Sequence, residues 1–127
     1  MKKLLLIFIS ILAVSALAAC GNKLDEETAD QYITQAKEVV QLLNEDNYEK
    51  VKEQFDAKMK AEFKEEHKEG LRSIIADAGQ FKAFEKQSVE EKDSLYTVVL
   101  VAKYSKVDHV YTIFINENNE IAGLYIK

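Results

Sequence analysis

The spacing of apolar residues changes at Gly79, and this change constrains the fold more than any other feature of the chain. Before Gly79, apolar residues recur every three or four positions, which is the period of one buried helix face. After Gly79 they alternate with polar residues, which is the period of a half-buried strand. A chain with helices first and strands second is typical of the α+β class. The sequence therefore predicts three N-terminal helices packed on one face of a four-stranded antiparallel sheet.

Caps and apolar stripes predict where the three helices lie. Thr28 and Gln31 have the spacing of a capping box, so the first helix is expected to start there. Asp46 or Asn47 can cap a short second helix, and Gly79 is suited to end the third in the left-handed conformation. The apolar positions of the three helices are Ala29, Ile33, Ala36, Val40 and Leu43, then Tyr48, Val51 and Phe55, then Leu71, Ile74, Ile75 and Ala78. Met59 and Phe63 are expected to cover the core between the second and third helices.

Four strands are expected at residues 81–90, 95–103, 109–116 and 120–126. The short links between them require antiparallel neighbours. With a turn at Lys106–Val107, the face toward the helices would pair Val98, Leu100, Ala102 and Tyr104 with Ile115, Ile113, Tyr111 and His109. The outer face would carry Thr97, Val99, Val101, Val110, Thr112 and Phe114.

An apolar run of 16 residues, Leu4 to Ala19, follows Lys2 and Lys3 and stops at Cys20. A basic start followed by an apolar run is typical of a secretory signal, and the run is shorter than the roughly 20 residues that span a bilayer. The stretch "LAACG" resembles the lipobox of bacterial lipoproteins, which implies cleavage before Cys20 and a lipid on its thiol. An ordinary secretory signal and an uncleaved anchor are the alternatives. We expect a signal peptide at 1–19, a short membrane-proximal tether at 20–27 and one domain at 28–127, on the extracytoplasmic face of a bacterial cell membrane.

Charge and composition exclude several kinds of partner and cofactor. The formal net charge is −5, and the acidic excess lies before residue 94. This balance argues against nucleic acid, whose phosphates need clustered Lys and Arg, and against adhesion to anionic lipid through a basic surface. The single cysteine cannot form a disulfide within the chain. Since no metal-ligand or phosphate-binding motif occurs, no cofactor and no metal are expected.

Four further segments resemble a known family. They are "VVQLLNEDNYEKVKEQFDAKMK", "GQF", "YTVVLVAKY" and "NENNEIAGLYI", and together they are similar to lipoproteins with a domain of unknown function in the nuclear transport factor 2-like superfamily. The resemblance implies a curved sheet wrapped over the helices as a cone with an internal cavity. Related sequences often have Gly in the last turn, where this chain has Asn119, which tolerates the left-handed conformation. A slip of one residue there would exchange Tyr125 for Leu124 on the inner face.

The candidate ligand pocket consists of Tyr104, His109 and Tyr111, which alternation places on the inner face near one end of the sheet. Members of that superfamily include isomerases and dehydratases with Asp, His or Tyr in the cone, so a catalytic His109 is one reading. No acidic residue alternates onto the same face of the second or third strand, and the adjacent Asp108 is expected to point to the other side. We therefore favour a packed or rim histidine, and we expect His67 to lie on a solvated helix edge.

Three functional classes remain open from the sequence. We favour a lipid-anchored, non-catalytic domain that binds a small apolar ligand or a peptide in the cone, because Tyr, Phe and aliphatic side chains typically line such pockets. The alternative is an interaction or oligomerisation module of the cell envelope, with a homodimer through the outer sheet face. An isomerase or dehydratase that uses His109 is the least favoured class.

Overall fold

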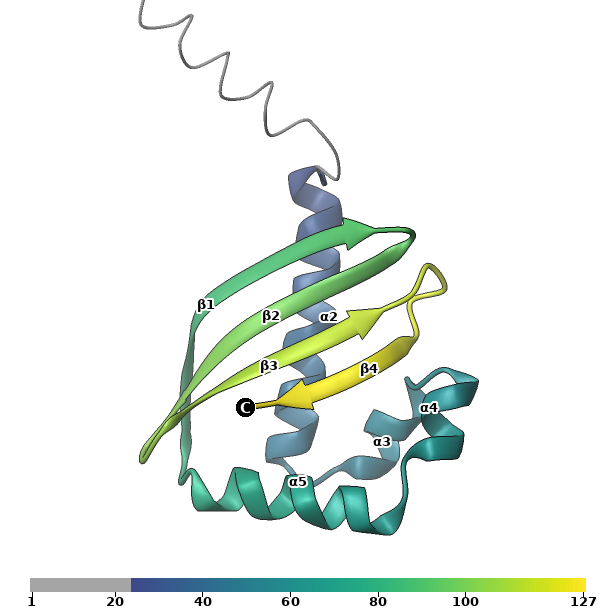
Figure 1. Ribbon diagram of the computed structural model, residues 1–127. Helices are drawn as coiled ribbons and strands as arrows, with labels where there is room; N and C mark the ends of the chain where they lie inside the picture. The colour runs from purple at the N-terminus through teal and green to yellow at the C-terminus, as the bar shows by residue number, and fades with distance from the viewer. Residues whose placement is uncertain (1–23) are drawn as a thin grey trace, which may run out of the picture.

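The structure, a computed structural model, describes residues 24–127, in which helices precede strands (Figure 1). The helices are α2 (Glu26–Asn44), α3 (Tyr48–Glu53), α4 (Ala57–Glu62) and α5 (Glu65–Asp77). The strands are β1 (Phe81–Lys92), β2 (Leu95–Tyr104), β3 (Asp108–Ile115) and β4 (Ile121–Ile126). The α+β class is therefore confirmed, but this range holds four helices where three were predicted.

The additional helix, α4, depends on a cap that the apolar pattern does not reveal. The Asp56 carboxylate accepts a hydrogen bond from the Met59 N–H at 2.8 Å and so starts a helix of only six residues. Such a helix is too short to show a period in the sequence. Met59 lies within α4 and Phe63 at its end, and both are partly buried against the core.

The start of α2 also differs from the prediction. The Asp25 carboxylate accepts from the Thr28 N–H at 2.9 Å, so the helix begins two residues before Thr28. Asn47, one of the two predicted residues, caps α3 through the Lys50 N–H. Gly79 has φ +93°, as expected of a residue that ends a helix in the left-handed conformation.

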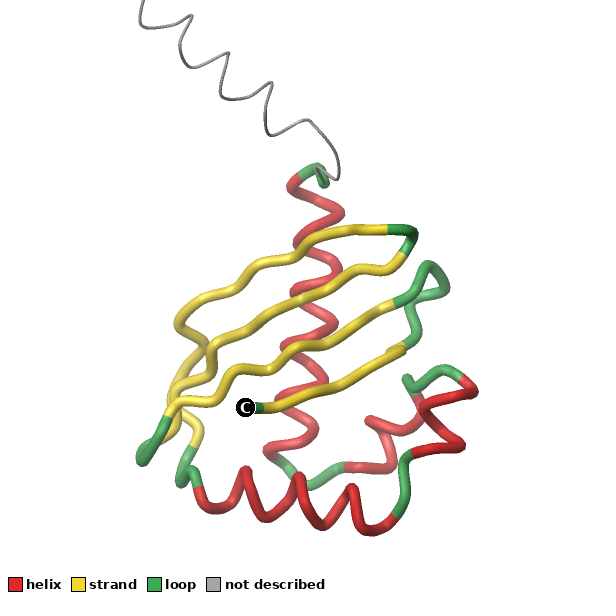
Figure 2. The backbone as a smooth tube through the Cα atoms, in the orientation of Figure 1, coloured by secondary structure: helices red, strands yellow, loops and turns green. Residues whose placement is uncertain are grey.

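The sheet is antiparallel with the strand order β1-β2-β3-β4 (Figure 2). Val98 lies opposite Ile113 and Leu100 opposite Tyr111, which corrects the predicted register by two residues. The cause is the turn: the Tyr104 N–H donates to the Val107 carbonyl at 3.1 Å, so the tip lies one residue earlier than predicted. Because side chains alternate with period two, a shift of two residues leaves every side chain on its predicted face.

The last strand has the register that the sequence left open. Leu124 lies opposite Ile113 and therefore on the inner face, whereas Tyr125 lies opposite Thr112 on the outer face. Asn119 adopts φ +64° in the preceding turn, which an asparagine tolerates. The sheet is open at β1 and β4, and the cone with an internal cavity that the resemblance implies is not confirmed.

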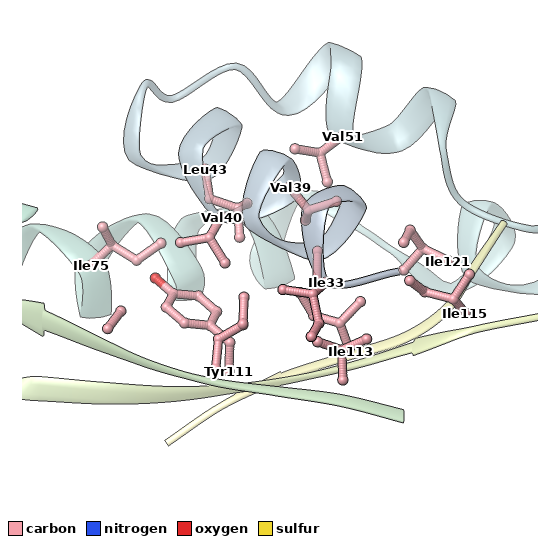
Figure 3. Packing of buried hydrophobic residues seen from close by; sticks show 14 of the residues in the cluster. Ile33, Val39, Val40, Leu43, Val51, Ile75, Tyr111, Ile113, Ile115 and Ile121 are labelled. Carbon is pink, nitrogen blue, oxygen red and sulfur yellow. The ribbon is translucent and has the colours of Figure 1, made fainter. Parts of the chain in front are cut away.

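The core lies between α2 and the inner face of the sheet (Figure 3). Ala36, Val39 and Val40 of α2 are fully buried. They share one cluster with fully buried sheet residues, which include Val98, Leu100, Tyr111, Ile113, Ile115 and Ile121. Burying such a side chain contributes about 1.5–3 kcal/mol. Side chains therefore fill the space under α2.

The outer face of the sheet is not covered by any helix within residues 24–127 (Figure 1). Val99, Val101 and Val110 are half-buried there. Tyr125 is 62% exposed, and its ring meets that of Phe114 edge to face at 5.8 Å. The apolar side chains that the sequence predicts for the outer face therefore lie on this face.

Candidate functional site

Two of the predicted pocket residues, Tyr104 and Tyr111, meet in the core. Their hydroxyl oxygens are 2.6 Å apart. Because Tyr104 donates to the Asn44 Oδ1 at 2.6 Å, the proton between the two phenols belongs to Tyr111. Burial raises the pKa of both phenols, and the Tyr104 hydroxyl raises the pKa of Tyr111 further. Both side chains therefore stay neutral at physiological pH.

The third predicted residue, His109, lies at the sheet end beside this pair. Its ring packs edge-on against Tyr104, with 5.6 Å between centroids. Nδ1 lies 3.1 Å from the main-chain oxygen of Lys127 and Nε2 lies 3.4 Å from the Ile74 carbonyl. Both oxygens can only accept, so a neutral imidazole can satisfy one of these contacts and an imidazolium both. This histidine links the end of the chain to α5.

A hollow of about 490 Å³ opens beside Tyr104, lined also by Asn44, Gln80 and Phe81. Tyr104 is only 3% exposed and Tyr111 is fully buried. Two buried polar atoms of this end of the core, the Tyr48 hydroxyl and Asn44 Nδ2, make no hydrogen bond to another group of the described residues. The three predicted residues thus lie together, two of them as core side chains.

A second opening, which the sequence does not predict, is the groove between α4, α5 and β4. It measures about 490 Å³. Its apolar walls are formed by Met59, Phe63, Leu71, Ile74, Leu124 and the ring of Tyr125, which also reaches the outer face. The volume lies within the range of roughly 300–1,000 Å³ that is common for ligand sites, and a mainly apolar lining is typical of them.

Helix α5 is attached to the rest of the molecule at a few points, which include the Arg72–Asp46 ion pair at 2.8 Å and the contact of His109 with the Ile74 carbonyl. At its C-terminal end, the Lys106 N–H donates to the Ala78 carbonyl at 2.9 Å, which ties the helix to the β2–β3 turn. At its N-terminal end, the Phe63 ring packs on Phe55 at 5.3 Å. Between these points Ile75 is the one buried residue of α5, and Ile74 is 43% exposed. Neighbouring residues therefore cover only part of the apolar face of α5, and Ile74 stays exposed.

Acidic side chains border the groove. Glu62 and Glu66 line it, and neither forms an ion pair with another described residue. His67 also lines it, and its Nδ1 accepts from the Lys64 N–H at 3.0 Å, which completes the start of α5. His67 is exposed on its helix edge, as predicted.

The sequence contains only part of the information that locates the groove. Leu71 and Ile74 are predicted as members of a buried stripe, and Met59 and Phe63 as cover for the core. Their spacing shows that they are apolar on one face, but nothing in the spacing shows how far α5 stands from β4. The partly exposed Ile74 is visible only in the folded chain.

The sequence also predicts a signal peptide, a lipid on Cys20 and no bound metal. Cys20 and the signal peptide at 1–19 lie outside the described residues. Within residues 24–127, no helix combines the length and apolarity needed to cross a bilayer. The same range contains no group of three or more His, Cys, Asp or Glu side chains that could hold a metal ion.

Comparisons with known proteins are consistent with this fold. A family model described as "Protein of unknown function (DUF3887)" matches residues 36–124. No curated protein matches the chain. An NMR structure of a protein from Ruminococcus gnavus is similar, with a TM-score of 0.66 and 23% identity over 80% of this chain and 90% of the other. That similarity shows the fold, and the family description names no enzyme activity.

Proposed function

We propose that the domain, which belongs to the DUF3887 family of proteins of unknown function, is a non-catalytic binding module whose site is the groove between α5 and β4. The ligand is a small apolar molecule or a peptide. The observation that carries the proposal is the exposed apolar wall of the groove, in which Ile74 is 43% exposed beside Leu71 and Leu124. Covering apolar surface of this kind is the main favourable term in most binding reactions.

The surroundings of His109 support a non-catalytic reading. Both ring nitrogens face main-chain oxygens, and no Asp or Glu side chain hydrogen-bonds to the ring within the described residues. A general base needs a reacting proton within hydrogen-bond reach and a partner that orients the ring. The main-chain oxygens of Ile74 and Lys127 take the positions that such groups would occupy.

The proposal includes attachment to the extracytoplasmic face of a bacterial membrane through lipid on Cys20. It is supported by the basic start, the apolar run and the "LAACG" stretch of the sequence. The resemblance to the nuclear transport factor 2-like superfamily is part of the same proposal, supported by α2, which covers one face of an antiparallel sheet.

A second candidate function is an interaction module that uses the outer sheet face. The observation in its favour is Tyr125, which is 62% exposed beside Phe114 on a face without a covering helix. Apolar patches of this kind often mark protein interfaces. The groove is the stronger candidate because its walls are concave and enclose a ligand-sized volume.

The test uses Met59 as a reporter in the groove wall. The chain has two methionines, Met1 and Met59, so a full chain in lipid nanodiscs with ¹³C-methyl methionine gives at most two methyl signals. N-phenyl-1-naphthylamine is the apolar probe, and its ring current should shift the Met59 signal in a saturable way. Ile74→Asp should abolish the shift, since it places a charge in the wall.

The matched control is Ser73→Asp, which adds the same charge to an exposed position of α5 outside the groove lining. This variant should keep the wild-type shift. A Met59 signal that does not respond to the probe, or that responds equally in Ile74→Asp, would show that the groove is not a binding site.

A further inference from the structure

Strand β4 is one edge of the sheet, and its register shows which backbone groups are free. Val110 and Lys127 exchange both N–H···O=C hydrogen bonds at 3.0 Å. Bonded and non-bonded pairs alternate along an antiparallel ladder, so Tyr125 and Gly123 also point their backbone groups at β3. Leu124 and Ile126, which lie between these pairs, therefore point their N–H and C=O groups away from the sheet.

One end of this edge already pairs with another segment. The Ile121 N–H donates to the Gln54 carbonyl at 2.7 Å, and the Ile121 carbonyl accepts from the Asp56 N–H at 2.9 Å. These bonds form a parallel bridge between Phe55 and Ile121. After Asp56 the chain turns into α4, so the pairing stops there. In the described residues, no backbone hydrogen bond from another element reaches Leu124 or Ile126.

The free edge lies directly beside the groove. Leu124 belongs both to β4 and to the groove lining, and Leu71 and Ile74 line it from α5. A strand added to β4 would alternate its side chains between the two faces of the sheet. Every second side chain would then point into the apolar groove. Backbone pairing supplies affinity in such complexes, and pockets for alternate side chains supply specificity.

The charge around the groove selects among extended chains. Glu62 and Glu66 have no ion-pair partner in the described part of the chain, whereas Lys68 and Arg72 of α5 pair with Glu65, Glu69 and Asp46. The rim is therefore complementary to a basic side chain.

We propose that the groove binds an extended peptide with apolar side chains at alternate positions and a Lys or Arg at its end, which pairs with the free edge of β4 as a fifth strand. This inference rests on the proposed function, because it names the ligand class of the same groove. Its distinctive content is backbone pairing at Leu124 and Ile126, which an apolar small molecule cannot provide.

The experiment uses amide hydrogen exchange of the full ¹⁵N-labelled chain in lipid nanodiscs. The probe is a pool of peptides about eight residues long, enough to extend past both ends of β4 at about 3.3 Å per residue. They carry Val, Ile, Leu or Phe at alternate positions, Thr between them and Lys at both ends. The pool should slow exchange at Leu124 and Ile126 at least about tenfold. Gly123 and Tyr125 serve as internal controls, since their amides are bonded to β3 with or without peptide.

Two altered pools test the two parts of the recognition. Peptides N-methylated at every second residue cannot donate along one edge, and we expect their binding to be weakened at least about fivefold. Peptides with Glu in place of Lys should also bind more weakly, because Glu62 and Glu66 repel them. Equal binding of the methylated pool would overturn strand pairing, and equal binding of the acidic pool would overturn the charge argument.

The outcomes separate this inference from the proposed function. If N-phenyl-1-naphthylamine shifts Met59 but the peptide pool protects neither Leu124 nor Ile126, the groove is a site for small apolar ligands and the peptide inference is wrong. If neither probe affects its reporter, the proposed function fails as well. If both amides become protected with rising protein concentration and no peptide, the occupant is a second copy, which also contradicts the inference.

Discussion

At the scale of single residues, three tyrosines share one end of the core but differ in what their hydroxyl groups contact. Tyr111 donates to Tyr104, and Tyr104 donates to Asn44. Tyr48 is 4% exposed, and its hydroxyl makes no hydrogen bond to another described group. Burial raises the pKa of all three phenols, so each hydroxyl keeps its proton. The same functional group therefore contributes differently to stability at neighbouring positions.

Removing the hydroxyl from Tyr111 or from Tyr48 should have different effects. Tyr111→Phe breaks a buried hydrogen bond and leaves the Tyr104 oxygen without its donor, so we expect a loss of about 0.5–1.5 kcal/mol in the free energy of unfolding. Tyr48→Phe removes a hydroxyl without a protein partner and is expected to be neutral or slightly stabilising. Urea midpoints of the two variants at unchanged slope measure the difference. A larger loss for Tyr48→Phe would contradict the assigned network.

The alternation of apolar residues placed Tyr104 and Tyr111 on the inner face of the sheet, and the structure confirms that placement. What alternation could not predict is their depth. Asn44, which accepts from Tyr104, lies 60 positions away at the end of α2. Whether an inner-face side chain is a rim or a core residue depends on such distant contacts. Their positions follow from the packing of α2 and not from the local period.

At the scale of elements, one glycine lies inside α5 and another follows it, and the two positions differ in whether they tolerate a side chain. Gly70 lies inside the helix, and a Cβ added there would meet nothing within 4 Å. Gly79 follows the helix with φ +93°, and a Cβ there would overlap the Ser105 Oγ. That oxygen accepts from the Gln80 N–H at 2.9 Å, so it cannot move without breaking a bond. One glycine is replaceable and the other is required.

Alanine substitutions should therefore change stability in opposite directions. Gly70→Ala should stabilise the protein by about 0.5–1 kcal/mol, since glycine is unfavourable inside a helix. Gly79→Ala should destabilise it by at least about 1 kcal/mol through backbone strain and the clash with Ser105. Thermal midpoints measured under identical conditions compare the two. Equal shifts would mean that Gly79 does not terminate α5 in the way described.

The strands were the most predictable elements, because alternation runs through β2 and β3 without interruption. The register was less predictable, since a shift of two residues changes no side chain's face. The count of helices was wrong because α4 depends on a single side chain, Asp56. The groove could not be predicted for a related reason: its shape depends on where α5 lies, and the bond from the Lys106 N–H to the Ala78 carbonyl joins the end of this helix to a turn far away in the sequence.

At the scale of the whole molecule, α2 separates the proposed anchor from the proposed binding site. Its 19 residues, at about 1.5 Å each, give a length of about 28 Å. The helix begins at the end of the molecule opposite α5 (Figure 1). If lipid on Cys20 holds the start of α2 close to the bilayer, the groove between α5 and β4 faces away from the membrane. A peptide could then reach β4 without approaching the lipid surface.

This arrangement requires that Cys20, and not the apolar run, attaches the mature protein. Because one acyl chain gives only marginal membrane attachment, a stable anchor at Cys20 needs at least a second chain. Cys20→Ala should therefore abolish labelling by radioactive palmitate and move the protein out of the carbonate-washed membrane fraction. Ser15→Ala is the matched control, because it alters the same N-terminal segment but leaves the thiol, and it should keep both label and location. A Cys20→Ala chain that stays in the washed membranes would identify the run from Leu4 to Ala19 as a true anchor. The groove would then keep its geometry, but its attachment would not depend on lipid.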